Sequence, residues 1–153
     1  MQFVISFLAD WMLVPIGLIA VYMLFWRVRG VDRYDKYTHI FMAGITSYFL
    51  AKVAAHIWQP TGLRPFEQLG TQAGATYLNN PGFPSDHALF AMFLTLAVWY
   101  ATRNKTVAII MLVLTLLLSA GRVLALVHTP LDIAGGIGIA LLGGIWYIAY
   151  AKK

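Results

Sequence analysis

The sequence contains no cysteine and few charged residues. Of its 153 residues, 11% are charged and 60% are hydrophobic, whereas roughly a quarter are charged in an ordinary soluble domain. Without cysteine, the chain has no disulfide bond, no thiolate metal site and no thiol nucleophile. The scarcity of charge excludes a solvent-exposed globule, a disordered chain and a coiled coil. With a mean hydropathy of +0.72, the composition indicates an integral membrane protein.

The charge balance is basic, with 11 Lys and Arg against 6 Asp and Glu and a net charge of +5. A nucleic-acid partner would require these residues to gather in a patch or stripe. They are instead scattered between apolar runs, so we expect no nucleic-acid partner. The surrounding membrane lipids are the expected environment.

Five apolar runs are long enough, or nearly so, for the roughly 20 residues that a membrane-spanning helix needs. We therefore predict an all-α membrane bundle of five transmembrane helices. This arrangement leaves no length for a separate soluble domain, so residues 1–153 are expected to form one membrane-embedded domain. The predicted spans are 3–26, 37–58, 86–103, 106–127 and 131–150.

The basic residues predict the orientation of these spans. Five spans place the 27–36 turn, the 103–105 turn and the C-terminal tail on one side of the membrane, and the positive-inside rule makes this side cytoplasmic. We therefore expect a multi-pass protein of the cell membrane. The basic residues on this side are Arg27, Arg29, Arg33, Lys36, Arg103, Lys105, Lys152 and Lys153.

Three cations, Lys52, Arg64 and Arg122, lie in or beside the connections on the opposite face. Positive charge at such a position is expensive, and it suggests a site for a negatively charged ligand. The alternative is that these cations only form ion pairs with acidic residues of the same face. The candidates for such pairs are Glu67, Asp86 and Asp132.

His128 and Asp132 are four residues apart, so one helical turn places both side chains on one face. An aspartate that binds one imidazole nitrogen orients the ring and leaves the other nitrogen free to attack. Small residues continue the same four-residue step after Asp132, which places the aspartate toward the bundle interior. These residues are Gly136, Ala140 and Gly144.

The third predicted span opens with Pro84-Ser85-Asp86-His87. Ser85 is a natural N-cap residue, and the free N–H groups of the first turn make this helix end suited to a phosphate. His87 would stand beside that phosphate and act as an acid. An ordinary capped helix start explains Ser85 and Asp86 equally well, but it does not explain His87. The remaining histidines are His39, expected at the cytoplasmic end, and His56, near the outer end of its span.

These segments resemble the three signatures of the type 2 phosphatidic acid phosphatase superfamily: Lys-x6-Arg-Pro, Pro-Ser-Gly-His and Ser-Arg-x5-His-x3-Asp. The third signature keeps its spacing, with Gly121 in place of Ser. The second has Asp86 in place of Gly, and the preceding Phe83 makes it similar to the bacterial undecaprenyl-diphosphatase branch. In the first, Arg64 is followed by proline, but Lys52 lies twelve positions before it instead of seven. The resemblance runs from about residue 50 to the C-terminus, with the signatures within 52–132, and the family usually has six spans.

The resemblance implies a reaction without metal or other cofactor. His128 would attack phosphorus to form a phosphohistidine, Asp132 would orient it, and His87 would protonate the leaving oxygen. The phosphoryl oxygens would then be bound by four residues: Arg64, Arg122, Ser85 and Lys52.

On this interpretation the protein is a lipid phosphatase whose site faces the outside of the cell, with undecaprenyl diphosphate as the favoured substrate. The lipid would enter sideways between helices and keep its tail in the membrane. A phosphatidate or phosphatidylglycerophosphate phosphatase, or a lipid phosphotransferase, is the alternative within the enzyme class. A non-enzymatic transporter or assembly protein is the alternative outside it. The oligomeric state is not encoded in any of these patterns.

Overall fold

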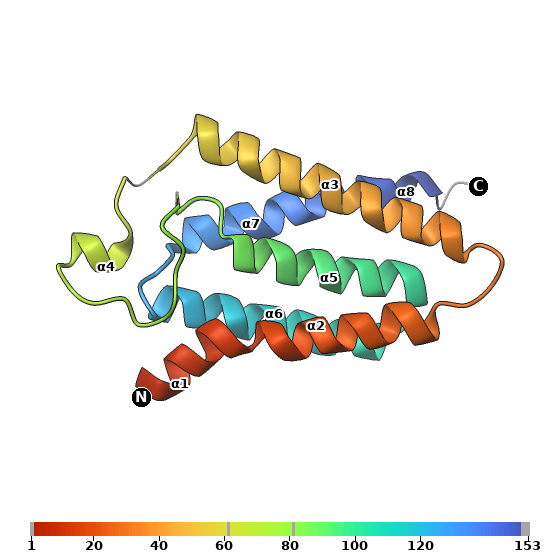
Figure 1. Cartoon of the computed structure of the whole chain (residues 1–153), viewed down its shortest axis with the longest axis horizontal. Helices are drawn as coiled ribbons and strands as arrows, with labels where there is room; N and C mark the ends of the chain where they lie inside the picture. Colours follow the sequence, from red (N-terminus) through yellow and green to blue (C-terminus); the bar gives the residue numbers. More distant parts are fainter. Residues whose placement is uncertain (1, 61, 81, 151–153) are drawn as a thin grey trace.

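A computed structural model describes residues 2–60, 62–80 and 82–150 of the chain (Figure 1). Every regular element in these residues is helical, which confirms the predicted all-α class. The first helical rod is the continuous stretch Gln2–Arg27, and it includes two π-helical segments, η1 and η2. The elements are α1 (Gln2–Ser6), η1 (Phe7–Trp11), α2 (Leu13–Tyr22), η2 (Met23–Arg27), α3 (Arg33–Ile57), α4 (Pro65–Gln68), α5 (Asp86–Thr102), α6 (Lys105–Leu124), α7 (Pro130–Gly143) and α8 (Ile145–Tyr150).

Four stretches of the described chain are long and apolar enough to cross a membrane: Gln2–Arg27, Arg33–Ile57, Lys105–Leu124 and Pro130–Ile148. The remaining predicted span, 86–103, corresponds to α5, which has 17 residues. At 1.5 Å per residue, α5 is about 25 Å long, slightly less than the thickness of a bilayer core. The chain therefore folds as an all-α bundle of a multi-pass membrane protein.

The helix ends differ from the predicted ones where apolar sequence continues beyond the helix. The fourth span was expected over 106–127, but α6 ends at Leu124, and Leu126 has a positive φ of 60°. The last span was expected to be continuous over 131–150, but it is interrupted at Gly144, between α7 and α8. Hydropathy does not locate these ends because the residues on both sides of them are equally apolar.

The helix α5 lies at the centre of the bundle (Figure 1). It packs against α7, α6, α2 and α3. Small residues on its buried faces allow this close approach on several sides, as expected for helices that pack in lipid. The buried alanines of α5 are Ala88, Ala91, Ala97 and Ala101.

The connections lie at the two ends of the bundle as predicted. The α2–α3 and α5–α6 connections and the end of α8 lie at one end, and the long connection from α3 to α5 lies at the other (Figure 1). The α6–α7 connection shares this second end, which is called the loop end below. The two basic turns therefore share one end of the molecule, whereas Lys152 and Lys153 lie outside the described residues.

Two glycines of α7 provide a test of the packing between α5 and α7. An added Cβ at Gly136 would lie 2.5 Å from the carbonyl oxygen of Ser85 and 3.1 Å from the nitrogen of Leu89, whereas one at Gly138 meets nothing within 4 Å. Gly136→Ala should therefore destabilise the protein by about 1–3 kcal/mol through overpacking. Gly138→Ala, which makes the same change in the same helix, should be neutral or slightly stabilising. Thermal unfolding of the two variants in detergent measures this difference, and equal stability would show that the helices are not in contact there.

Candidate active site

Ser85 caps α5 at the loop end of the bundle. Its Oγ accepts a hydrogen bond from the N–H of Ala88 at 3.5 Å, which confirms the predicted N-cap. The N–H of Ser85 donates to the carbonyl oxygen of Asp132 at 2.9 Å, so the first turns of α5 and α7 are joined directly. The Ser85 side chain is completely buried. His87 follows in the first turn of α5 and is partly exposed.

His128 lies in the connection between α6 and α7, not on a helix. The N–H groups of Val127 and His128 both donate to the carbonyl oxygen of Arg122, at 3.3 and 3.4 Å. Thr129 then caps α7: its Oγ1 accepts from the N–H of Asp132 at 3.1 Å, and Asp132 Oδ2 accepts from the N–H of Thr129 at 2.7 Å. This capping box turns Asp132 back toward His128. The two side chains meet across a helix cap, in place of the predicted shared helix face.

His128 Nδ1 and Asp132 Oδ2 are 3.6 Å apart, which is longer than a hydrogen bond. Among the described residues, neither His128 Nδ1 nor Asp132 Oδ1 has a hydrogen-bond partner. Catalytic contacts of this kind are often long in an empty site and shorten when the substrate is bound. Asp132 is 2% exposed, so it faces the bundle interior, as the four-residue stripe predicts.

The surroundings of His128 favour a neutral imidazole. Burial lowers the pKa of His128 below its ordinary value of 6.5, and it is the largest effect. The contact with Asp132 opposes this change, whereas the positive charges of Arg122 and Arg64 lower the pKa further. The ring is therefore neutral at pH 7, and only the neutral ring has a free electron pair with which to act as a nucleophile.

Arg64 is a buried cation held by neutral oxygen atoms. Its guanidinium donates to the carbonyl oxygens of Val127 at 2.7 Å, Leu78 at 3.0 Å and Asn80 at 3.2 Å, and to Asn80 Oδ1 at 2.9 Å. Glu67, one of the predicted ion-pair partners, binds the backbone N–H of Arg64 at 2.6 Å instead. Burial lowers the pKa of Arg64, and Asp132 and Glu67 raise it from a distance. A buried cation that is held by neutral oxygen atoms is stabilised when an anion binds beside it.

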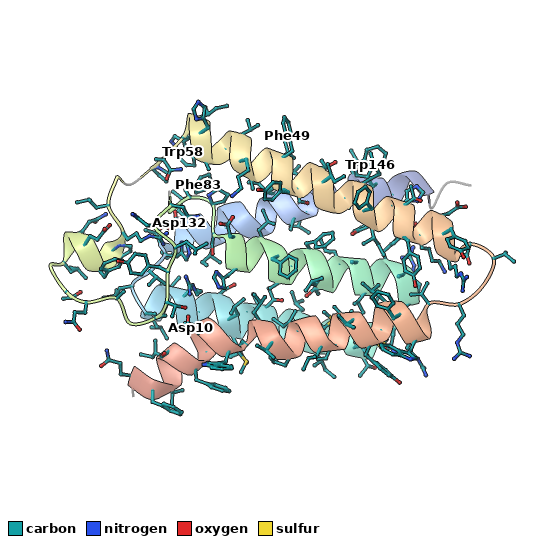
Figure 2. The ribbon with its side chains drawn as sticks, viewed as in Figure 1. Asp10, Phe49, Trp58, Phe83, Asp132 and Trp146 are labelled. Atoms are coloured by element: carbon teal, nitrogen blue, oxygen red, sulfur yellow. The ribbon has the colours of Figure 1, made fainter. Side chains whose placement is uncertain are left out.

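Arg122 is almost completely buried, with 1% of its surface exposed. Its Nη1 donates to Asp10 Oδ1 at 3.1 Å and to the carbonyl oxygen of Thr76 at 2.8 Å. Asp10 also accepts from the N–H and the Oγ1 of Thr76, at 3.2 and 2.8 Å. Arg122 Nε has no hydrogen-bond partner among the described residues. Figure 2 shows Asp10 and Asp132 at the same end of the bundle.

The glycine that replaces serine in the third signature lies at this contact. A Cβ at Gly121 would lie 2.7 Å from the nitrogen of Ala9 and 2.9 Å from the carbonyl carbon of Leu8. The backbone of η1 thus approaches α6 more closely than any residue with a side chain allows. This close approach lets Asp10, which lies in η1, reach Arg122.

One small pocket at the loop end brings most of the predicted site residues together. It has a volume of about 20 Å³, which is room for roughly one water molecule. A phosphate would therefore have to displace parts of the present lining. The residues that line the pocket are Arg64, Leu78, Asn80, Pro84, Asp86, His87, Arg122 and His128.

Two predicted phosphate ligands, Ser85 and Lys52, lie outside this lining. Ser85 uses its hydroxyl to cap α5. Lys52 lies near the end of α3, where its Nζ is 3.8 Å from Asp86 Oδ1, and both side chains are about half exposed, at 48% and 43%. Lys52 therefore forms an ion pair with an acidic residue of the same face, which is the alternative that the sequence offered to a phosphate site.

The other two histidines do not enter the pocket. His39 lies toward the opposite end, where its Nδ1 is 2.6 Å from the carbonyl oxygen of Asp35, and His56 is exposed near the end of α3. Within the described residues, no three His, Asp or Glu side chains are grouped so as to hold a metal ion.

Asp10 is the site residue that sequence reasoning missed. Asp10 is the one acidic residue in the first apolar run, and no motif connects it to the three signatures. A carboxylate inside a membrane span is expensive and points by itself to a functional partner. That signal was present in the sequence, although it did not identify Arg122 as the partner.

The fold and the pocket together define a polytopic membrane protein with a cationic, histidine-lined site at one end. A family model described as the PAP2 superfamily matches residues 36–153, and the chain belongs to this superfamily. Members of the superfamily are phosphatases, so the protein is an enzyme of that class. Searches of curated proteins and of solved structures found no match. The matched segment contains both histidines of the pocket but not Asp10.

Proposed function

We propose that the protein hydrolyses a lipid diphosphate, with undecaprenyl diphosphate as the favoured substrate, at the outer face of the cell membrane. The observation that carries this proposal is that one pocket is lined by four of the predicted site residues: His87, His128, Arg64 and Arg122. It lies at the end of the bundle opposite the basic turns, and the positive-inside rule assigns those turns to the cytoplasm. The similarity of residues 83–87 to the bacterial undecaprenyl-diphosphatase branch supports the choice of lipid.

In the first step, His128 attacks the terminal phosphorus. Because its Nδ1 faces Asp132, Nε2 is the nitrogen that forms the bond. The bond between phosphorus and the leaving oxygen breaks, and the electron pair stays on that oxygen. His87 donates a proton to the same oxygen. The charge of a bound phosphate favours protonated His87, since an opposite charge nearby stabilises the imidazolium.

In the second step, water hydrolyses the phosphohistidine. The neutral form of His87 takes a proton from the attacking water, inorganic phosphate leaves, and His128 regains its free nitrogen. Arg64 and Arg122 stabilise the charge on the phosphoryl oxygens in both steps. Cations held in place before the reaction are usually the largest single contribution to catalysis of this kind.

The test is a phosphate-release assay on the purified protein in detergent. We expect release from undecaprenyl diphosphate to be faster than release from phosphatidate or phosphatidylglycerophosphate, and we expect EDTA to leave the rate unchanged. Faster release from one of the other two lipids would reassign the substrate. Transfer of the phosphoryl group to an added alcohol without release would indicate a phosphotransferase. Turnover of none of these lipids would favour a transporter or assembly protein, and a strict requirement for Mg²⁺ would contradict the proposed steps.

The lowered pKa of His128 predicts the acid side of the pH profile. Only neutral His128 attacks phosphorus, so kcat/KM should fall as the pH decreases through the pKa of His128, which lies below 6.5. Asp132 raises that pKa, so Asp132→Asn should move the acid limb to lower pH and also slow the reaction. The shift between the two enzymes on one substrate is the relevant measurement, because the ionisation of the substrate is then the same. An acid limb that moves to higher pH in Asp132→Asn would contradict the assignment.

A further inference from the structure

Two of the three residues that depart from the family signatures, Lys52 and Asp86, are paired with each other. Lys52 is displaced along α3, Asp86 replaces a glycine, and the Nζ and Oδ1 atoms of the two are 3.8 Å apart. Asp86 Oδ2 also accepts a hydrogen bond from Asn80 Nδ2 at 3.2 Å, and Asn80 Oδ1 accepts one from Arg64 at 2.9 Å. A chain of polar contacts thus leads from the pocket of the histidines to Lys52.

A second pocket, of about 240 Å³, adjoins the first one on the side of α3. The two pockets share Asn80, Pro84 and Asp86 in their linings. Of these two pockets, only the second is lined by Lys52, which supplies its positive charge. Two adjacent pockets therefore contain basic side chains, one with Arg64 and Arg122 beside the histidines and one with Lys52 beside Asp86.

Lys52 also lies at the end of an apolar groove of about 630 Å³ along α3. The groove extends from Tyr37 to Lys52, and Phe93 of α5 contributes to its wall. Fifteen residues of helix correspond to about 22 Å, which is most of the thickness of a bilayer core. Of the lining residues, Lys52 is the one that carries a charge. A hydrocarbon tail in this groove would have its polar end at Lys52.

We propose that Lys52 binds the phosphate next to the lipid in a lipid diphosphate, while the terminal phosphate lies between His87 and His128 and the tail lies in the α3 groove. This inference rests on the proposed function and assigns the parts of its substrate to positions in the molecule. Asp86 neutralises Lys52 in the empty enzyme, and the lipid-linked phosphate takes its place when the substrate binds. Asp86 keeps its hydrogen bond from Asn80 in both states.

The experiment compares farnesyl diphosphate with farnesyl monophosphate, which carry the same tail. For Lys52→Met, the ratio of kcat/KM for the diphosphate to that for the monophosphate should fall by about 10- to 100-fold, as expected for the loss of one charge-assisted hydrogen bond. Lys52→Arg should retain most of the ratio. A change of less than about threefold in the ratio for Lys52→Met would overturn the proposal.

Asp86→Asn is the matched control because it breaks the same ion pair but keeps the cation. The ratio of kcat/KM for the diphosphate to that for the monophosphate should stay the same or rise in Asp86→Asn, since the carboxylate that competes for Lys52 is gone. A fall as large as that in Lys52→Met would show that the ion pair has a structural role, and the proposal would fail. A wild-type enzyme that hydrolyses the monophosphate but not the diphosphate would also overturn it, while the phosphatase assignment would stand. Turnover of neither lipid would refute both.

The position of the tail has its own test. A Cβ at Gly44 would lie 3.1 Å from the ring of Phe93, whereas one at Gly17 on α2 meets nothing within 4 Å. Gly44→Val should therefore narrow the groove and raise KM for farnesyl diphosphate by about tenfold, the effect of one or two lost apolar contacts. It should have little effect on KM for the much shorter isopentenyl diphosphate. Gly17→Val is the control, and equal effects of the two variants, or equal effects on the two substrates, would place the tail elsewhere.

Discussion

Replacement of His128 by alanine should reduce phosphate release from lipid diphosphates by a factor on the order of 10⁴ or more, as the loss of a covalent nucleophile does in other enzymes. The imidazole is buried, neutral and directed by Asp132, and no other side chain in the pocket combines these properties. His39→Ala is the matched control, because His39 lies near the start of α3, and this end of α3 is opposite the loop end (Figure 1). Rates are measured by phosphate release in detergent, and folding by the thermal unfolding of both variants.

A labelling experiment distinguishes covalent catalysis from a supporting role of His128. When the terminal phosphate of the substrate is radiolabelled and the reaction is quenched rapidly, the wild-type chain should carry label that is labile to acid and stable to alkali. The His128→Ala chain should carry none. Full activity, or label retained in the variant, would rule out the proposed nucleophile.

Loss of Asp10 should have the second largest effect, because it leaves Arg122 buried without a counter-ion. Removal of one partner of a buried ion pair typically costs about 3–5 kcal/mol of stability. In addition, kcat/KM should fall by about 10- to 100-fold, since Arg122 would lose one of the contacts that hold its guanidinium toward the pocket. Asp10→Leu tests both effects, and Asp10→Asn, which keeps an acceptor for Thr76, tests the charge alone with less risk to folding.

The coupling between Asp10 and Arg122 separates positioning from general stability. If Asp10 acts through Arg122, then Asp10→Asn should cause no further fall in kcat/KM once Arg122 has been changed to methionine. Additive losses would instead indicate independent roles. Asp35→Asn is the control for loss of one acidic residue, because Asp35 is exposed in the first turn of α3 at the other end of the bundle.

The sequence predicts the parts of the site that depend on local spacing. His87 follows a helix cap, and Asp132 follows His128 by four residues. Arg64, in a connection, and Arg122, in the last turn of α6, lie at the same end of the bundle. Each of these relations involves neighbouring residues or the alternation of spans across a membrane. Hydropathy and capping rules describe both well, and five helical rods were therefore predictable.

The remaining relations depend on contacts between distant residues. Asp10 and Arg122 are separated by 112 positions, and their contact requires the close approach at Gly121 that only the folded bundle shows. Lys52 was expected among the phosphate ligands by resemblance, but its place on α3 leaves it beside Asp86. His128 was expected on a helix, and a capping box brings it to Asp132 instead. Spacing along the chain identifies these residues, but it does not specify their partners.

The placement of Asp10 has a consequence for how far the signatures define the enzyme. The segment that matches the superfamily contains both histidines and both arginines of the pocket, yet the partner of Arg122 comes from the first helical rod, outside that segment. The segment that identifies the family therefore leaves out the residue that pairs with Arg122. If the proposed mechanism holds, the catalytic unit of this protein includes a helix that carries none of the signature residues.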